Sequence, residues 1–343
     1  MPNADPRLRS LERWLASLPG LPVSDIAPAS GDASFRRYFR IRRNGETQIA
    51  MDAPPEHEEI GSYLRVARLL AATGVNVPPV LAIDEARGFV LIGDLGSLQY
   101  LDALATGADP EPLYADAIDA LLRLQAAGTT PASVLPAYDR DRLRREMELF
   151  PEWFVTRHLG LVPDAREQRL IESTFDWLCG EALLQPVVLV HRDYHSRNLM
   201  VCPGRNPGIL DFQDAVRGPV SYDLVSLLKD CYIVWPRARW LGWLDRYRAG
   251  ALRLGLDAGS SRDEFIRWFE LMGLQRHLKV LGIFARLWYR DGKAGYLADL
   301  PRVLDYTLDV TGSVSELSEF DGFLRRRIVP AFAIAARRAG GQP

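Results

Sequence analysis

Residues 187–215 constrain the fold of this chain more than any other stretch. An apolar run, Val187–Val190, leads into a dense polar cluster, then a second apolar pulse at 199–201, a turn rich in Gly and Pro, and a third short apolar pulse. Runs of this length bounded by turn residues are typical of short buried strands, although the first could also be a hydrophobic loop entry. The pattern predicts a loop that feeds a β-hairpin, which would bring Asn198 beside Asp211.

Three side chains in this stretch are of the types that phosphoryl transfer requires. Carboxylate and amide oxygens are hard ligands suited to Mg²⁺ on a polyphosphate, so Asn198 and Asp211 are candidate metal ligands. Asp193 precedes them, where a carboxylate can orient an attacking hydroxyl and accept its proton. A transition-metal site built from His191, Asp193 and His195 is the alternative. No fourth ligand follows nearby, and that site would leave the Asn and the second Asp without a role.

Two strings carry a resemblance to a known family. HRDYHSRN, which begins at His191, and DFQDA, which begins at Asp211, resemble the catalytic loop and the metal loop of kinases. The histidine two residues after the catalytic aspartate resembles the aminoglycoside phosphotransferase (APH) branch rather than the protein kinases. We therefore expect a member of that family.

The resemblance implies an α+β, protein-kinase-like bilobal fold. A small β-rich nucleotide-binding N-lobe is expected over residues 1–95, and a larger, mainly helical catalytic and substrate-binding C-lobe over residues 96–343. ATP would be the phosphoryl donor with Mg²⁺, Asp193 the base, and Asn198 and Asp211 the metal ligands. The resemblance assigns support of the catalytic loop to His191, His195 and Asp223.

The first lobe offers a candidate phosphate loop but no lysine. The run from Ala29 to Ile41 predicts a small polar turn followed by a strand, and backbone N–H groups in such a turn can approach a phosphate closely. A plain hairpin turn is the alternative. Kinases carry a phosphate-binding lysine on the next strand, here 48–52, where this chain has Met51. No lysine precedes Lys229.

Two explanations of the missing lysine stay open. Either an arginine near residues 36–40 supplies the charge, or the nucleotide binds without that contact. The usual lysine–glutamate pair is also lost, so Glu58 and Glu59 receive no role. By resemblance, the segment after residue 92 is the hinge that meets adenine. The candidate nucleotide-binding residues are Ser30, Gly31, Ser34, Arg36, Arg37, Gly93, Asp94 and Leu95.

Helical periodicity dominates the remainder of the chain. Helices are predicted over 7–18, 56–72, 111–127, 139–158, 164–184 and 271–290, and strands over 80–83 and 89–92. After Ala215 the chain is expected to be helical throughout.

The predicted helix at 271–290 carries basic side chains among core-spaced leucines. Each alone would extend to solvent, but the cluster suggests an anionic substrate. With the two strings above, this helix resembles the APH-type kinases that phosphorylate the anomeric (C1) hydroxyl of N-acetylmuramate and N-acetylglucosamine, in peptidoglycan recycling toward the uridine-diphosphate sugar. The sugar comes from this resemblance alone. The candidate substrate-binding residues are Arg197, Asp214, Arg276, His277, Lys279 and Arg286.

Two other functions remain open. One is an APH-type kinase of another small molecule, such as an aminoglycoside, choline or another sugar; a cationic acceptor would need an acidic pocket, which the basic helix argues against. The other is a non-catalytic nucleotide-binding module, suggested by the missing lysine. A pure binding module has no need of a base, so the retained Asp193 argues against it.

The composition of the chain argues against nucleic acid and membranes as binding partners. With 48% hydrophobic and 25% charged residues and a net charge of −2, the chain has the make-up of a soluble globular protein without the basic character of a nucleic-acid binder. No apolar run approaches the ~20 residues of a membrane span, and the N-terminus has no apolar signal core. Three scattered cysteines predict no disulfide framework. We expect a cytoplasmic protein, most simply a monomer, whose partner is a small amino sugar.

Overall fold

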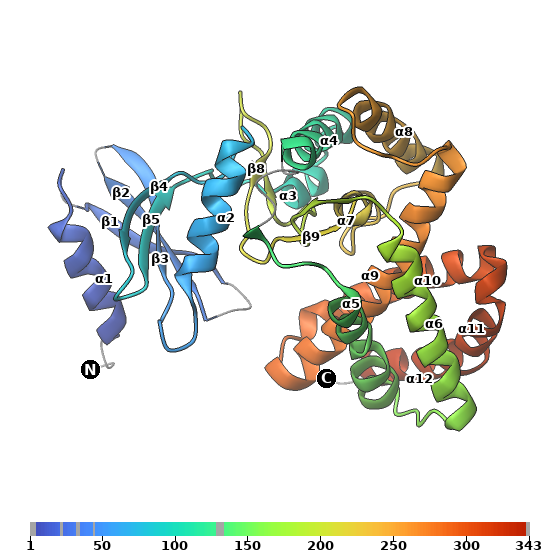
Figure 1. Cartoon of the computed structure of the whole chain (residues 1–343). Helices are drawn as coiled ribbons and strands as arrows, with labels where there is room; N and C mark the ends of the chain where they lie inside the picture. Colours follow the sequence, from blue (N-terminus) through green and yellow to red (C-terminus); the bar gives the residue numbers. More distant parts are fainter. Residues whose placement is uncertain (1–4, 21–22, 32–34, 44, 128–133, 341–343) are drawn as a thin grey trace. The chain divides into compact units, whose positions relative to one another are not determined.

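The computed structural model describes residues 5–20, 23–31, 35–43, 45–127 and 134–340 (Figure 1). Its internal contacts divide the chain into two compact units. Unit 1 comprises Met1–Ala117 and Arg197–Asp214, and unit 2 comprises Ile118–Ser196 and Ala215–Pro343. These units are defined by contacts between residues. The predicted boundary between residues 95 and 96 separates a nucleotide-binding lobe from a catalytic lobe, and it stays a prediction.

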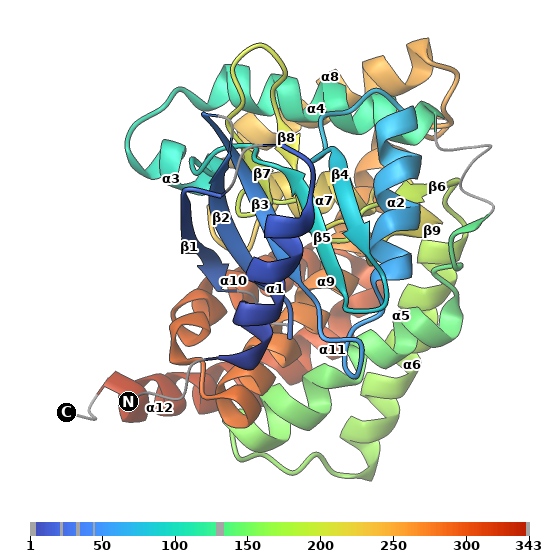
Figure 2. The same cartoon turned by 90° about the vertical axis from the view of Figure 1, so that its left-hand side faces the viewer.

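Unit 1 is built on a five-stranded antiparallel sheet with the order β1-β2-β3-β5-β4 (Figures 1 and 2). The strands are β1 (Asp25–Gly31), β2 (Arg37–Arg43), β3 (Glu46–Asp52), β4 (Val80–Asp84) and β5 (Phe89–Gly93). The helices are α1 (Pro6–Ser17), α2 (Ile60–Ala72) and α3 (Tyr100–Ala105), and α4 (Pro110–Ala127) begins in this unit and ends in unit 2. The first helix and the predicted strands that correspond to β2, β3, β4 and β5 are confirmed. Strand β1 was not predicted, and it includes residues 29–31, which the sequence analysis had placed in a turn.

Helices α1 and α2 lie on opposite sides of this sheet (Figure 1). On the α1 side, Trp14 and its neighbours pack against Phe39 and Ile41 of β2, which are buried. On the other side, Tyr63 of α2 is buried. Because strand residues alternate between faces, this packing decides which side of the sheet each charged residue of β2 and β3 occupies.

Helix α2 begins four residues later than the sequence predicted. The backbone N–H groups of His57 and Glu58 both donate to the carbonyl of Pro54, each at 2.9 Å, and close a turn there. Two consecutive prolines at 54 and 55 favour such a turn over the helical start that the apolar periodicity indicated.

The predicted hairpin within residues 197–214 is confirmed and belongs to unit 1. Its strands are β7 (Leu199–Met200) and β8 (Gly208–Ile209), which pair in antiparallel register. Bridges from Asn76 to Gly208 and from Gln99 to Met200 attach the hairpin to two loops of the same unit. The N–H of Leu210 donates to the carbonyl of Asn198 at 2.9 Å, which extends the ladder by one bond.

Unit 2 is mainly helical, and many of its elements pack against the long helix α9 (Figure 1). This long helix packs against η2, α5, α6, α7, α8 and α10. The elements are α5 (Arg140–Met147), η2 (Phe150–His158), α6 (Ala165–Leu183), β6 (Val187–Val190), β9 (Val216–Pro219), α7 (Tyr222–Leu228), α8 (Arg237–Arg253), α9 (Arg262–Asp291), η3 (Ala294–Asp299), α10 (Leu300–Ser313), η4 (Ser315–Leu317), α11 (Ser318–Phe323), η5 (Leu324–Ile328) and α12 (Val329–Gly340). The helices predicted over 164–184 and 271–290 are confirmed, and the one predicted over 139–158 is divided into α5 and the π-helix η2.

The prediction of an entirely helical chain after Ala215 is wrong for the first few residues. β9 forms there and pairs antiparallel with β6, with Val187 opposite Pro219 and Val190 opposite Val216. The partner strand lies in a distant part of the sequence, so local periodicity gave no signal for it. The pairing settles that the apolar run before the polar cluster is a strand. In the described part of the chain, no helix is long and apolar enough to cross a membrane.

Candidate active site

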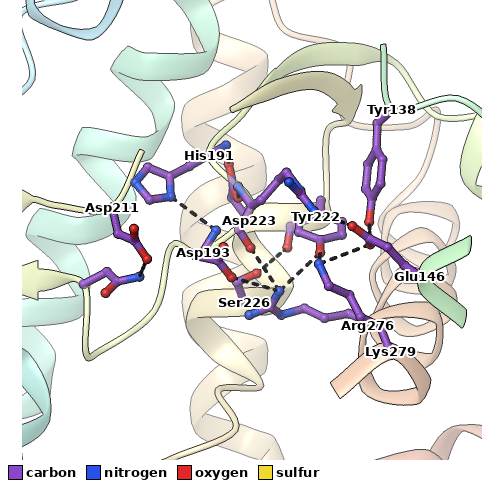
Figure 3. A network of polar contacts seen from close by, with 12 residues as sticks. Tyr138, Glu146, His191, Asp193, Asp211, Tyr222, Asp223, Ser226, Arg276 and Lys279 are labelled. Carbon is purple, nitrogen blue, oxygen red and sulfur yellow. Dashed lines mark hydrogen bonds and ion pairs between the residues drawn. The ribbon is translucent and has the colours of Figure 1, made fainter. Parts of the chain in front are cut away.

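The catalytic loop (residues 191–198) follows directly on β6, and its part up to Ser196 belongs to unit 2. Asp223 of α7 is fully buried and accepts two backbone hydrogen bonds from the loop, from the N–H of His191 at 2.6 Å and from the N–H of Arg192 at 2.9 Å. Each carboxylate oxygen takes one of them. These are the contacts that the predicted supporting role of Asp223 requires (Figure 3).

Arg192 has an unusual backbone conformation, with φ +79°. Left-handed backbone is uncommon outside glycine and costs of order 1 kcal/mol or more, so surrounding contacts must hold it. The Arg192 side chain forms an ion pair with Glu146 of α5. One residue later, the N–H of Asp193 donates to Nδ1 of the buried His191 at 3.3 Å. The turn therefore sits directly before the proposed base.

A second buried carboxylate, which the sequence analysis missed, binds the backbone of the loop at Ser196. Asp230, 1% exposed, accepts from the N–H of Ser196 and from the N–H of Tyr232, both at 2.9 Å. The Tyr232 ring packs edge-on against the ring of His195, with centroids 5.4 Å apart. Asp193 thus lies between two backbone segments that buried carboxylates hold in place.

Positive charge surrounds Asp193 within unit 2. Its carboxylate is 37% exposed and lies 4.0 Å from a terminal nitrogen of Arg276. Burial alone would raise the pKa of Asp193, but the charges of Lys279 and Arg276 outweigh it and lower that pKa to about 2. The carboxylate is therefore ionised at any working pH and available to accept a proton.

Asp223 behaves in the opposite way. Its burial raises the pKa to about 7, although the hydrogen bonds from His191 and Arg192 and the charge of Arg276 act to lower it. The nearby charge of Asp193 adds to the upward shift. Two carboxyl groups on neighbouring elements thus have well-separated pKa values, because one faces the cations of α9 and the other is enclosed.

In unit 1, the hairpin brings the two candidate metal ligands together. The side-chain nitrogen of Asn198 donates to Oδ2 of Asp211 at 3.3 Å, and Nε2 of Gln213 donates to Oδ1 at 2.7 Å. Asp211 has φ +60°, a second non-glycine residue in left-handed conformation. Phe212 stacks on Tyr63 of α2 at 5.0 Å between ring centroids, which fixes this segment against the helix.

These residues fit Mg²⁺. A carboxylate and an amide oxygen are hard donors, and Mg²⁺ usually takes only one or two protein ligands and completes its shell with waters and phosphate oxygens. The alternative transition-metal triad is not formed, because the described residues contain no group of three or more His, Cys, Asp or Glu that could hold a metal ion. His191 is fully buried and instead accepts the backbone hydrogen bond of Asp193.

Arg36 and Arg37 have different acidic partners. Arg37 forms ion pairs with Asp52 and Asp5, on the side of the sheet that α1 covers. This placement corrects its prediction as a nucleotide contact, because both acidic partners lie on that side. Arg36 donates from Nε and one terminal nitrogen to Glu58, at 3.1 and 2.9 Å. Glu58 thus acquires a basic partner that the sequence analysis had not assigned.

The other residues that the sequence analysis predicted to bind nucleotide lie at two places in unit 1. Ser30 and Gly31 end β1, and Ser34 lies outside the described residues. At the other place, Gly93 ends β5. Asp94 accepts from Nε of Arg40 at 2.7 Å. The carbonyl of Leu95 accepts from the Cys202 thiol at 3.3 Å.

The predicted substrate residues of α9 are mostly buried. His277 is completely buried and stacks on Tyr306 at 4.9 Å between ring centroids, and burial lowers its pKa to about 3. Neutral and enclosed, it cannot be a cationic substrate contact, which corrects that prediction. Arg276 and Lys279 are 3% and 5% exposed. Arg286 and Arg197 are half-buried and Asp214 is exposed, and their role in substrate binding stays a prediction.

Sequence reasoning missed several members of this site. None carried a local signal, because each contacts its partner from an element that no local pattern links to it. Glu146, for example, lies in an arginine-rich helix where a surface ion pair was the ordinary expectation. The missed residues are Glu58, Tyr138, Glu146, Tyr222 and Asp230.

Comparison with known proteins identifies the family. The profile of the phosphotransferase enzyme family matches residues 25–265. The chain belongs to this family. It is 46% identical over 330 residues to an N-acetylmuramate/N-acetylglucosamine kinase of Pseudomonas putida, covering 93% of this chain and 96% of that one. An N-acetylmuramate/N-acetylglucosamine kinase of Neisseria meningitidis is 45% identical, with 90% and 92% covered. The chain is therefore a phosphotransferase that acts on a hydroxyl acceptor.

Solved structures confirm the kinase-like fold. An ADP-bound aminoglycoside phosphotransferase, APH(2'')-Ib, aligns with a TM-score of 0.59 at 14% identity, covering 90% of this chain and 99% of that one. The choline kinase LicA from Streptococcus pneumoniae aligns with a TM-score of 0.61 at 11% identity, covering 88% and 99%. At such low identity these structures establish the fold alone.

The two carboxyl groups near Arg192 provide a test of the site electrostatics. Carbon-13 NMR of aspartate-labelled protein, with signals assigned by their loss in Asp193→Asn and Asp223→Asn, should show Asp193 unchanged from about pH 4 to about pH 8. The Asp223 signal should titrate with a pKa of about 7. An Asp193 signal that titrates within this range would mean that the cations of α9 do not act on it.

Proposed function

We propose that the chain is an ATP-dependent kinase of N-acetylmuramate and N-acetylglucosamine that phosphorylates the anomeric hydroxyl. The observation that carries the proposal is the identity of 45–46% with three kinases of that name, over nine-tenths or more of the chain. The retained Asp193, Asn198 and Asp211 support catalysis over simple nucleotide binding. The proposal includes a cytoplasmic role in cell-wall recycling, supplying a sugar 1-phosphate for uridylyl transfer.

The properties of Asp193 suit this reaction. The hydroxyl oxygen forms a bond to the γ-phosphorus of ATP, the bond from that phosphorus to the β–γ bridging oxygen breaks to release ADP, and Asp193 accepts the hydroxyl proton. In phosphoryl transfer the transition state is loose, so the base mainly orients the hydroxyl and takes its proton late. An anomeric hydroxyl is more acidic than an ordinary alcohol. A carboxylate whose pKa is lowered to about 2 can therefore serve.

Asn198 and Asp211 would hold Mg²⁺. When bound, Mg²⁺ neutralises charge on the β- and γ-phosphates. The hydrogen bonds from Asn198 and Gln213 to the two oxygens of Asp211 orient its carboxylate before any metal arrives. Preorganisation of this kind reduces the cost of ordering the ligands on binding.

Phosphorus NMR tests the proposed reaction directly. We expect ATP and Mg²⁺ with either sugar to give a sugar phosphate whose signal shows coupling to the anomeric proton, with one ADP per product. Choline and an aminoglycoside serve as comparison acceptors, and Asp193→Asn as the enzyme control. A 6-phosphate, or turnover only with choline or the aminoglycoside, would contradict the proposal.

Arg36 is the arginine best placed to replace the missing lysine. The charge of Arg36 acts on Tyr63 of α2, which places Arg36 toward the face that α2 covers, whereas Arg37 lies toward α1. The Asp211–Phe212 segment also packs on α2, through Tyr63. Paired with Glu58, Arg36 places a fixed cation on that face, and its planar fork suits phosphate oxygens. We include Arg36, and exclude Arg37, in the proposed nucleotide site.

The variants Arg36→Ala and Arg37→Ala form a matched pair that tests this choice. We expect Arg36→Ala to raise the KM for ATP roughly 10- to 100-fold, as loss of a hydrogen bond to a charged group predicts, and Arg37→Ala to leave it near the parent value. Thermal unfolding of both checks that the fold is retained. A KM for ATP that rises in Arg37→Ala but not in Arg36→Ala would exclude Arg36 from the nucleotide site.

A further inference from the structure

Two buried cations of α9 lie against Tyr222, next to the catalytic loop in unit 2 (Figure 3). Arg276 and Lys279 are three residues apart and therefore share a face of the helix. They are 3% and 5% exposed. The charged groups of both lie over the ring of Tyr222, at 5.5 and 5.8 Å from its centroid. Burying two cations is costly unless partners satisfy them, so their contacts indicate what they do.

Arg276 contacts the catalytic loop directly. Its terminal nitrogen donates to the backbone carbonyl of Arg192 at 3.0 Å and to the hydroxyl of Tyr222 at 3.2 Å. The same nitrogen lies 4.0 Å from Oδ1 of Asp193. With Asp223 holding the Arg192 N–H, the peptide groups on both sides of this left-handed residue carry a charge-assisted hydrogen bond. Arg276 therefore connects α9 to the turn that aims the base.

Lys279 reaches the same residue through its side chain. Its ammonium group donates to the Tyr222 hydroxyl at 3.1 Å and pairs with Glu146 at 3.1 Å. Glu146 in turn pairs with the guanidinium of Arg192 and accepts from the hydroxyl of Tyr138. Arg192 is thus held at its N–H, its carbonyl and its guanidinium group, by residues from three different helices.

The cations of this cluster also act on the base. Arg192 and Lys279 share the carboxylate of Glu146, whereas Arg276 lies 4.0 Å from the carboxylate of Asp193. Lys279 and Arg276 are the strongest charges that act on the pKa of Asp193. An ionised carboxylate in this surrounding is attracted toward α9 rather than left free to rotate.

We propose that Arg276 and Lys279 are positioning residues: they hold Arg192 in its left-handed conformation and keep the Asp193 carboxylate aimed at the acceptor hydroxyl. This inference rests on the proposed function, which gives Asp193 its acceptor. It replaces the sequence-based expectation that both cations bind an anionic substrate. Their charged groups are already engaged with Arg192, Tyr222 and Glu146, and only a few per cent of either side chain is exposed.

Steady-state kinetics separate positioning from substrate binding. We expect Arg276→Lys, which keeps the charge but loses the planar fork, and Lys279→Met, which keeps the length but loses the charge, to lower kcat on the order of 10- to 100-fold. The KM values for N-acetylmuramate and ATP should stay within about twofold, since loss of transition-state positioning leaves ground-state binding intact. Arg267→Gln, which removes the ion pairs of a more exposed arginine on the same helix with Glu181 and Glu316, is the matched control and should match the parent.

A second readout does not need turnover. The groups that act on Asp193 in unit 2 are Lys279 and Arg276 on α9, Arg192 and His195 in the loop, and Asp223 on α7. Removing the Lys279 charge should raise the pKa of Asp193, so its carboxyl signal in carbon-13 NMR should begin to titrate at higher pH in Lys279→Met than in the parent. Arg267→Gln should leave this signal unchanged.

The outcomes separate the two proposals. A parent enzyme that phosphorylates neither amino sugar contradicts the proposed function, and the carboxyl titration in Lys279→Met still decides the role of the cations. Variants that keep kcat but raise the KM for N-acetylmuramate would show that the cations bind substrate and would overturn the positioning role. If either variant fails to fold, as thermal unfolding would reveal, the other decides, with an unchanged kcat and an unshifted Asp193 titration counting against the inference.

Discussion

The left-handed backbone at Arg192 is the constraint on which the catalytic part of unit 2 depends. A non-glycine residue with φ +79° is unfavourable by itself and persists only where neighbouring contacts stabilise it. Here Asp223 accepts from its N–H, Arg276 donates to its carbonyl, and Glu146 pairs with its side chain. The local strain is thus offset by buried, charge-assisted hydrogen bonds. The next residue, Asp193, takes its direction from this arrangement.

The charges that stabilise the turn also determine the state of the base. Carboxylates alone around this loop would push the pKa of Asp193 upward, as burial does for Asp223. The cations of α9 reverse that effect for Asp193 and leave ionised the carboxylate that we propose as the proton acceptor. Backbone geometry and charge state are therefore coupled through Arg276, which contacts both the turn and the carboxylate.

The sequence was sufficient for those parts of the site that are local. Asp193, Asn198 and Asp211 stand at a spacing that predicted a loop and a hairpin, and the hairpin brings Asn198 and Asp211 into hydrogen-bond contact. Helices α1, α4, α6 and α9 followed from their apolar periodicity. Strand β9 did not, because its partner β6 lies in a distant part of the chain.

The environment of the loop could not be predicted in the same way. Arg276 and Lys279 were recognised as unusual, but their burial and their contacts with Arg192, Tyr222 and Glu146 depend on how α5, α7 and α9 pack. Because both side chains are buried against the protein, we propose positioning rather than substrate binding for them. The pairing of Arg36 with Glu58 was missed for the same reason, since the two residues lie on different elements whose approach no local pattern encodes.

The most direct test of this account is Asp193→Asn, which keeps the size of the side chain and removes its charge. We measure kcat with MgATP and N-acetylmuramate, and the Kd of MgATP by calorimetry. The account predicts a loss of about 10²- to 10⁴-fold in kcat, the usual range for a general base, with the affinity for MgATP nearly unchanged. A variant that turns over at the parent rate would contradict it, because the base would then have to be another residue.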